Sequence, residues 1–68
     1  MMEGEKEEVE ELVRTLRSIF WTAKAFPPEL VQAVCAKLKS MSEDAVIYFY
    51  SQFHGYFANA AKYFVKED

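Results

Sequence analysis

The segment from Ala45 to Val65, AVIYFYSQFHGYFANAAKYFV, holds eight of the chain's eleven aromatic side chains. Between Ala45 and Ala61 it contains no Asp, Glu, Lys or Arg. So apolar a stretch must be covered by other parts of the protein, yet the chain has only 68 residues. A chain of that length forms one domain at most, near the lower limit at which a single hydrophobic core is stable. What covers this segment therefore decides the fold.

Small domains are usually supported by disulfides, a bound metal or oligomerisation. Cys35 is the only cysteine, which excludes an intrachain disulfide and a multi-cysteine zinc site. Hydrophobic residues make up 51% of the chain, a large share for a domain with so much surface. Self-association is therefore the expected support. A single free cysteine and the lack of a signal-peptide pattern in MMEGEKEEVEE favour a cytoplasmic location.

The net charge of −3 is unevenly distributed along the chain. Residues 1–11 carry a net charge of −5, residues 12–42 carry +4 and residues 43–68 carry −2. We expect residues 1–8 to form an acidic, partly disordered arm and residues 9–68 to form a single helical domain. The middle of the chain is locally basic although the whole chain is acidic.

Hydrophobic periodicity predicts an all-α fold, a small three-helix bundle with helices over about 5–25, 28–39 and 43–66. The first helix should end before Phe26-Pro27-Pro28, because a residue that precedes proline is pushed out of the helical conformation. Within it, Glu10 stands four residues before Arg14, which is the spacing of a supporting ion pair. The two prolines suit the first turn of the second helix.

The third predicted helix is long for so small a domain, and Ser42 is a candidate for its N-cap. Gly55 stands in its middle, where glycine costs about 1 kcal/mol relative to alanine. Either the close approach of another backbone or a slight bend of the helix would explain that glycine. Tyr48 falls on the polar back of the helix and is expected to be exposed.

A helical wheel of the third helix places four phenylalanines and an alanine on one core-facing stripe, namely Phe49, Phe53, Phe57, Ala60 and Phe64. The apolar arc continues on both flanks to roughly 220°, whereas a surface helix needs about 100°. Two short helices cannot cover so wide an arc, so we expect a homodimer formed through the third helix. The expected interface residues are Ile47, Tyr50, His54, Ala58, Ala61, Val65, Tyr56 and Tyr63.

The same segment is long enough to span a bilayer, which takes about 20 residues. Gln52, His54, Asn59 and Lys62 would each be costly in hydrocarbon, so no integral membrane insertion is expected. The lone histidine, His54, and the lone cysteine are too few for a metal site with three or four protein ligands. No nucleophile and base are placed together by the sequence. We predict a protein that is not an enzyme and binds no cofactor or metal.

Four residues of the first helix share one face opposite its apolar stripe, namely Arg14, Arg17, Trp21 and Lys24. A basic row with an interleaved aromatic side chain suits phosphate contacts and base stacking. Alternatively, the row is a solvated face with Trp21 folded over the Phe26-Pro27-Pro28 corner or over a neighbouring chain. It could also be a protein contact that uses Trp21 as an anchor. The sequence therefore favours a self-associating protein-interaction or scaffold module that also docks a second protein. A small regulatory nucleic-acid-binding protein is the alternative.

Overall fold

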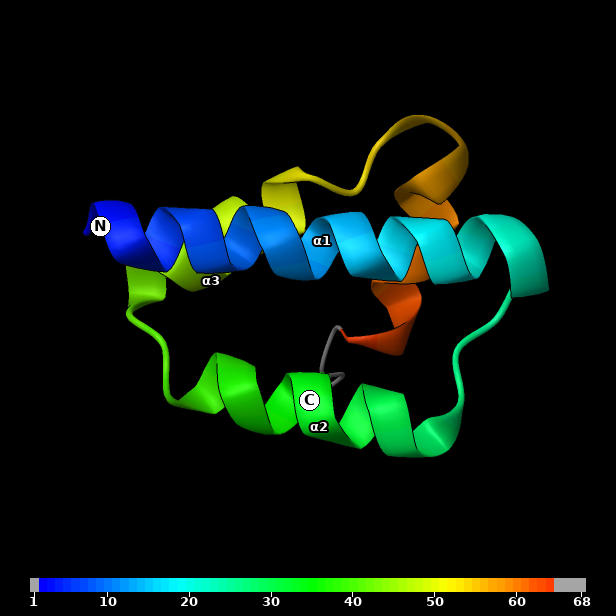
Figure 1. Cartoon of the computed structure of the whole chain (residues 1–68), viewed down its shortest axis with the longest axis horizontal. Helices are drawn as coiled ribbons and strands as arrows, with labels where there is room; N and C mark the ends of the chain where they lie inside the picture. Colours follow the sequence, from blue (N-terminus) through cyan, green and yellow to red (C-terminus); the bar gives the residue numbers. More distant parts are fainter. Residues whose placement is uncertain (1, 65–68) are drawn as a thin grey trace.

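The computed structural model describes residues 2–64, and every element in that range is helical (Figure 1). The elements are α1 (Glu3–Ala23), α2 (Pro28–Lys39), α3 (Glu43–Ser51) and the 3₁₀ helix η1 (Gly55–Tyr63). The predicted all-α class is confirmed. The division into an arm of 1–8 and a domain of 9–68 stays a prediction, although α1 already begins at Glu3.

Three cross-contacts show how α3 lies along α1. The side chain of Glu5 contacts Ser42, that of Glu10 contacts Tyr48, and that of Arg17 contacts the Gln52 carbonyl. Residue numbers rise together along both helices, so α3 runs parallel to the first half of α1. Figure 1 shows α2 on one side of α1, running in the opposite direction and leading back to the start of α3, and η1 lying near the second half of α1.

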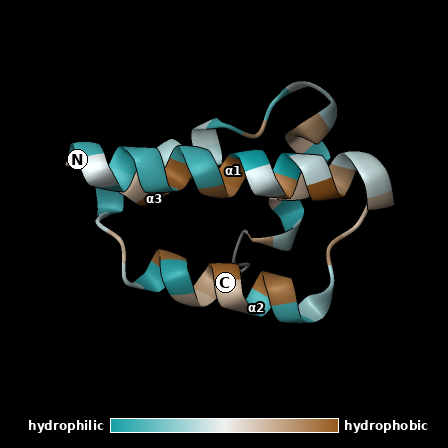
Figure 2. Ribbon diagram, viewed as in Figure 1, coloured by the Kyte–Doolittle hydropathy of each residue, from teal (hydrophilic) through white to brown (hydrophobic). Residues whose placement is uncertain are grey.

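α1 ends at Ala23, two residues before the expected end. Lys24 adopts the left-handed conformation (φ 62°), and its N–H donates to the carbonyl of Phe20 at 2.8 Å. A left-handed residue that closes the last turn in this way is a common helix C-terminus. The chain then turns through Phe26 and starts α2 at Pro28, as expected for proline in a first turn. Figure 2 shows hydrophobic and hydrophilic residues alternating along α1 and α2, as in helices with one buried face.

Ser42 caps the N-terminus of α3, as predicted. Its hydroxyl oxygen accepts a hydrogen bond from the N–H of Ala45 at 3.3 Å. The carboxylate of Glu5 in turn accepts hydrogen bonds from the Ser42 N–H at 2.9 Å and from its hydroxyl at 2.7 Å. Ser42 therefore caps α3 and also joins α3 to α1.

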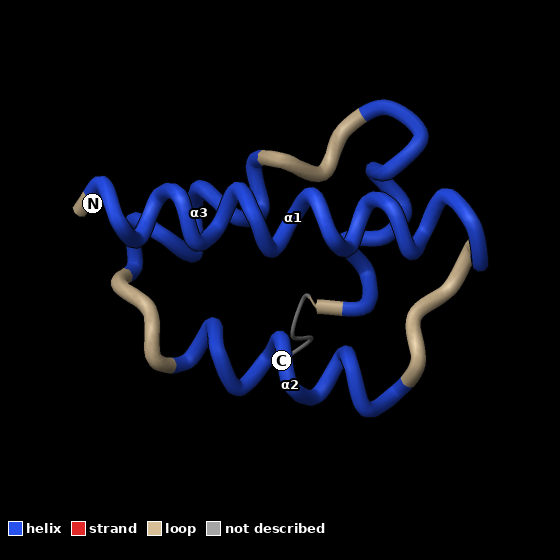
Figure 3. Tube along the Cα trace, viewed as in Figure 1, coloured by secondary structure: helices blue, strands red, loops and turns tan. Residues whose placement is uncertain are grey.

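The prediction of one helix over 43–66 is wrong within the described residues. α3 ends at Ser51, and a loop separates it from η1 (Figure 3). His54 is extended, and Gly55 has a φ of +64°. A Cβ at Gly55 would meet no atom within 4 Å, so no neighbouring backbone explains the glycine. Its reason is conformational, because an L-residue in this left-handed region costs about 1–2 kcal/mol.

The break lets the aromatic segment fold back on itself. In a continuous helix, Phe49 and Phe64 would stand about 22 Å apart along the axis. Their ring centroids are instead 5.7 Å apart, and Phe53 stacks on Phe57 at 4.6 Å. The expected stripe does enter the core, where only Phe53 is half-buried, but it does so across a turn. The buried residues are Val9, Val13, Leu16, Phe26, Val34, Leu38, Ala45, Phe49, Phe57, Ala60 and Phe64.

Candidate functional site

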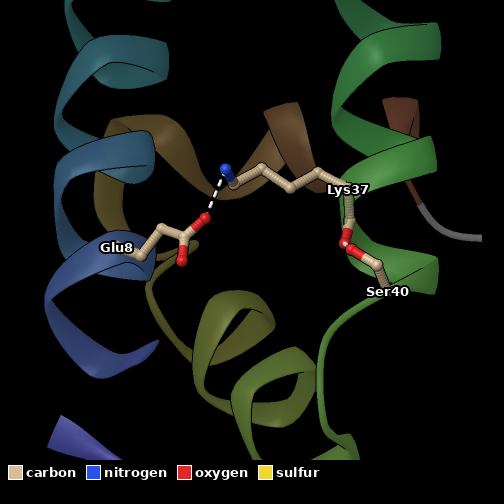
Figure 4. A network of polar contacts seen from close by, with 3 residues as sticks. All are labelled: Glu8, Lys37 and Ser40. Carbon is tan, nitrogen blue, oxygen red and sulfur yellow. Dashed lines mark hydrogen bonds and ion pairs between the residues drawn. The ribbon is translucent and has the colours of Figure 1, made fainter. Parts of the chain in front are cut away.

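Polar contacts join the N-terminal half of α1 to α2 and to the start of α3. Figure 4 shows the ion pair between the Glu8 carboxylate and the Lys37 ammonium, with the Ser40 hydroxyl donating to the Lys37 carbonyl at 2.8 Å. The hydrogen bonds from the Ser42 N–H and hydroxyl lower the pKa of Glu5 below its usual value of 4.5. Each of these groups has its partner within the chain, so the contacts serve the fold.

Glu10 does not form the predicted ion pair with Arg14. Its carboxylate accepts a hydrogen bond from the Tyr48 hydroxyl at 2.6 Å, and this bond raises the pKa of Tyr48. Tyr48 is half-buried, where the sequence predicted exposure, because it faces α1 at this point. Arg14 is exposed, and it has no ion pair or side-chain hydrogen bond among residues 2–64.

The break distributes the predicted interface residues over α3, the following loop and η1, so they do not share one helix face. Tyr50 is half-buried, and its hydroxyl donates to the Phe64 carbonyl at 2.9 Å. Burial and the nearby Cys35 raise the pKa of Tyr50. Tyr63 packs edge-on against Phe26 with ring centroids 5.1 Å apart. Both tyrosines are thus used inside the chain.

The remaining predicted interface residues differ in their exposure. Ile47 is 60% exposed and Tyr56 is 50% exposed. His54 and Ala58 are exposed as well, while Ala61 is half-buried. The prediction for residue 65 lies outside the described residues. The main apolar groups left at the surface of this segment are therefore one residue on α3 and one on η1.

Trp21 and Tyr56 form an exposed aromatic pair, the Trp21–Tyr56 surface, between α1 and η1. Trp21 is 60% exposed, and its ring meets that of Tyr56 edge-to-face with centroids 4.9 Å apart. The Lys24 ammonium lies 4.7 Å from the centroid of the Trp21 ring, within the range of a cation–π interaction. Trp21 thus packs on η1, through its contact with Tyr56. No pattern in the sequence predicts the contact between Trp21 and Tyr56, because the two residues lie on separate elements.

Arg17 bridges the break between α3 and η1. Its guanidinium donates to the Gln52 carbonyl at 3.4 Å and lies 5.5 Å from the centroid of the Phe57 ring. Gln52 is the C-cap of α3, where the helix dipole favours a positive charge. Of the four residues of the predicted anionic-partner face, Arg17 is directed into the fold and Lys24 covers Trp21. Arg14 is the one whose charge is unengaged among the described residues.

A shallow apolar cleft of about 170 Å³ lies between α2 and the folded-back segment. Its walls are formed by Cys35, Leu38, Lys39, Val46, Tyr50 and Phe64. Beyond the thiol, a lysine and the tyrosine hydroxyl already bound to the Phe64 carbonyl, the cleft offers no polar group. Among residues 2–64, no three His, Cys, Asp or Glu side chains come together as a metal site would require. The same residues contain no helix with the length and hydropathy of a membrane span.

No protein-family model, curated protein or solved structure matches this chain. Its function therefore has to be argued from its own surface, of which the Trp21–Tyr56 surface is the most distinctive part.

Proposed function

We propose that the chain is a small protein-interaction module that associates with itself, and that Trp21 is an anchor residue of the contact. The observation that carries this proposal is the Trp21–Tyr56 surface. Two large aromatic rings from separate elements lie against each other, and both stay at least half exposed. Trp, Tyr and Arg are the residue types that most often dominate the binding energy of protein interfaces.

The Trp21–Tyr56 surface is not the interface that the sequence predicts on the third helix. The wide apolar arc is the reason to expect a dimer through the third helix, but the fold-back buries Phe49, Phe57 and Phe64, and the exposed residues of the arc do not share one helix face. Trp21, in contrast, keeps most of its ring outside the core. An edge-to-face partner and a cation fix its orientation, and a side chain that is already ordered loses less entropy on binding.

Sedimentation equilibrium from low micromolar to near-millimolar concentration tests the proposal. We expect reversible dimers that weaken when Trp21→Ser removes the indole, with the helical circular dichroism spectrum unchanged. Ile47→Ser is the matched control, because Ile47 is exposed to the same extent as Trp21 but lies on α3. A monomer at every concentration contradicts self-association. Loss of the dimer in Ile47→Ser but not in Trp21→Ser would place the contact on α3 instead.

A further inference from the structure

The outer face of α1 carries opposite charges at its two ends. At 100° per residue, Glu3, Glu7, Arg14 and Trp21 fall on one side of the helix, away from the buried Val9, Val13 and Leu16, and all four are exposed. Glu7, like Arg14, makes no ion pair or side-chain hydrogen bond among residues 2–64. One unengaged acid and one unengaged base thus stand two helical turns apart on the same face.

Such a face is complementary to itself. In a two-fold symmetric contact, residue i of one copy meets residue j of the other, and the reverse contact follows by symmetry. We infer, resting on the proposed function, that α1 packs antiparallel against α1 of a second copy, with the two-fold axis between Glu7 and Arg14. Glu7 of each copy then pairs with Arg14 of the other, so that one arrangement forms two ion pairs.

The same register also covers Trp21, at the apolar end of the face. Trp21 of one copy reaches the first turn of α1 in the other, where Met2 is 79% exposed. A thioether beside an aromatic ring is a favourable contact. Trp21 is the exposed large hydrophobic side chain of this face, and the antiparallel pair covers it.

The charges near the axis limit the strength of this contact. Glu10 and Glu11 stand on either side of the axis, and their counterparts in the second copy lie opposite. The carboxylate of Glu10 is turned toward Tyr48, whose hydroxyl is 2.6 Å away, while each Arg14 approaches Glu11 as well as Glu7. A contact along one helix of about 31 Å belongs to the small, transient class of interfaces. The dimer is therefore weak and sensitive to salt.

A charge exchange tests the register directly. We expect Glu7→Arg and Arg14→Glu each to raise the dimer dissociation constant about tenfold or more, because each variant places like charges opposite one another twice. An equimolar mixture of the two variants should associate as tightly as the original protein, since both ion pairs re-form in the mixed dimer. The double variant Glu7→Arg/Arg14→Glu should recover for the same reason. Sedimentation equilibrium at low salt measures all four samples.

The outcomes separate this inference from the proposed function. If the original protein dimerises but the mixture and the double variant stay as weak as the single variants, the register is wrong while self-association stands. If Glu7→Arg tightens the dimer, Arg14 does not face Glu7 and the inference is overturned. If the original protein is monomeric throughout, both ideas fail. Circular dichroism of each variant shows that the fold is retained, and Glu29→Arg on α2 is the control for an exposed charge outside the face.

Discussion

Along its N-terminal half, α1 is joined to its neighbours by polar side chains, whereas along its C-terminal half it packs against aromatic rings. The first half uses Glu5, Glu8 and Glu10 to reach Ser42, Lys37 and Tyr48. The second half uses Phe20 and Trp21 to reach Phe57 and Tyr56. The same segment, 43–64, supplies α3 to the polar half and η1 to the aromatic half.

This difference has an energetic consequence. Exposed ion pairs and hydrogen bonds contribute little each, because water competes for both partners. A fully buried phenylalanine contributes several times more through the apolar surface that it removes from water. We therefore expect the aromatic half to carry most of the stability and the polar half to fix the register of α3 against α1.

The largest effect should come from the aromatic half. Phe57→Ala removes a fully buried ring that stacks on Phe53 and meets Phe20, and such changes cost about 3–5 kcal/mol. A small single core rarely supplies more than that, so this variant should be largely unfolded by circular dichroism. Phe57→Leu keeps most of the volume and should still fold, with a measurable loss in urea unfolding. Tyr56→Ala, at the next position but exposed, is the control. Equal losses of stability in Phe57→Ala and Tyr56→Ala would contradict the buried aromatic cluster.

A smaller effect should come from the polar half. Ser42→Ala removes the N-cap of α3 and the hydroxyl bound by Glu5, and loss of a cap costs about 1 kcal/mol. Ser51→Ala, which removes a hydroxyl bonded to the Tyr48 carbonyl within α3, should change the free energy of unfolding by less than about 0.5 kcal/mol. Urea unfolding of both variants gives the comparison. A loss at Ser42 as large as that at Phe57 would reverse the ranking of the two halves.

The contact at Ser42 also predicts a dependence on pH. The folded-state pKa of Glu5 lies below 4.5, so its contribution is present above that value and is lost as the pH falls through the folded pKa. Glu5→Gln should therefore unfold with a weaker acid dependence than the original protein. Glu29→Gln, which removes an exposed glutamate of α2 with no partner among residues 2–64, should keep the original dependence. The same acid dependence in both variants would show that Glu5 is not held by Ser42.

Much of the core could be predicted from the sequence, because periodicity identifies the residues that turn inward whatever their exact geometry. Val9, Val13 and Leu16 on α1 and Val34 and Leu38 on α2 stand three or four residues apart, as on one face of a helix, and all are buried. The break after Ser51 could not be predicted in this way. The apolar spacing of a helix continues across it, and Gly55 alone does not distinguish a bend from a left-handed residue.

The candidate site was only partly foreseen. Spacing along α1 identified Arg14, Arg17, Trp21 and Lys24 as one face, but the partners of these residues come from distant parts of the chain. Arg17 is directed to Gln52 and Phe57 because the break brings both within reach. Residues 35 or more positions apart meet only once the fold is formed, and no local pattern records such contacts.

The central claim is that the chain breaks at Gly55 and closes its aromatic core within one copy. The change in the free energy of unfolding caused by Gly55→Ala tests this claim, because a continuous helix and a break at Gly55 predict opposite signs for it. In a continuous helix, alanine would stabilise the protein by about 1 kcal/mol. At a φ of +64°, it should destabilise the protein by about 1–2 kcal/mol.

Two controls make that sign decisive. Gly4→Ala lies in the first turn of α1, with equally open space around its Cβ, and should leave stability unchanged or slightly raised. D-alanine at position 55, introduced by chemical synthesis, prefers positive φ and should be tolerated, whereas it would disrupt a continuous right-handed helix. A left-handed Gly55 requires that L-alanine at position 55 lowers the urea midpoint and that D-alanine does not. A midpoint raised by L-alanine and lowered by D-alanine would contradict it.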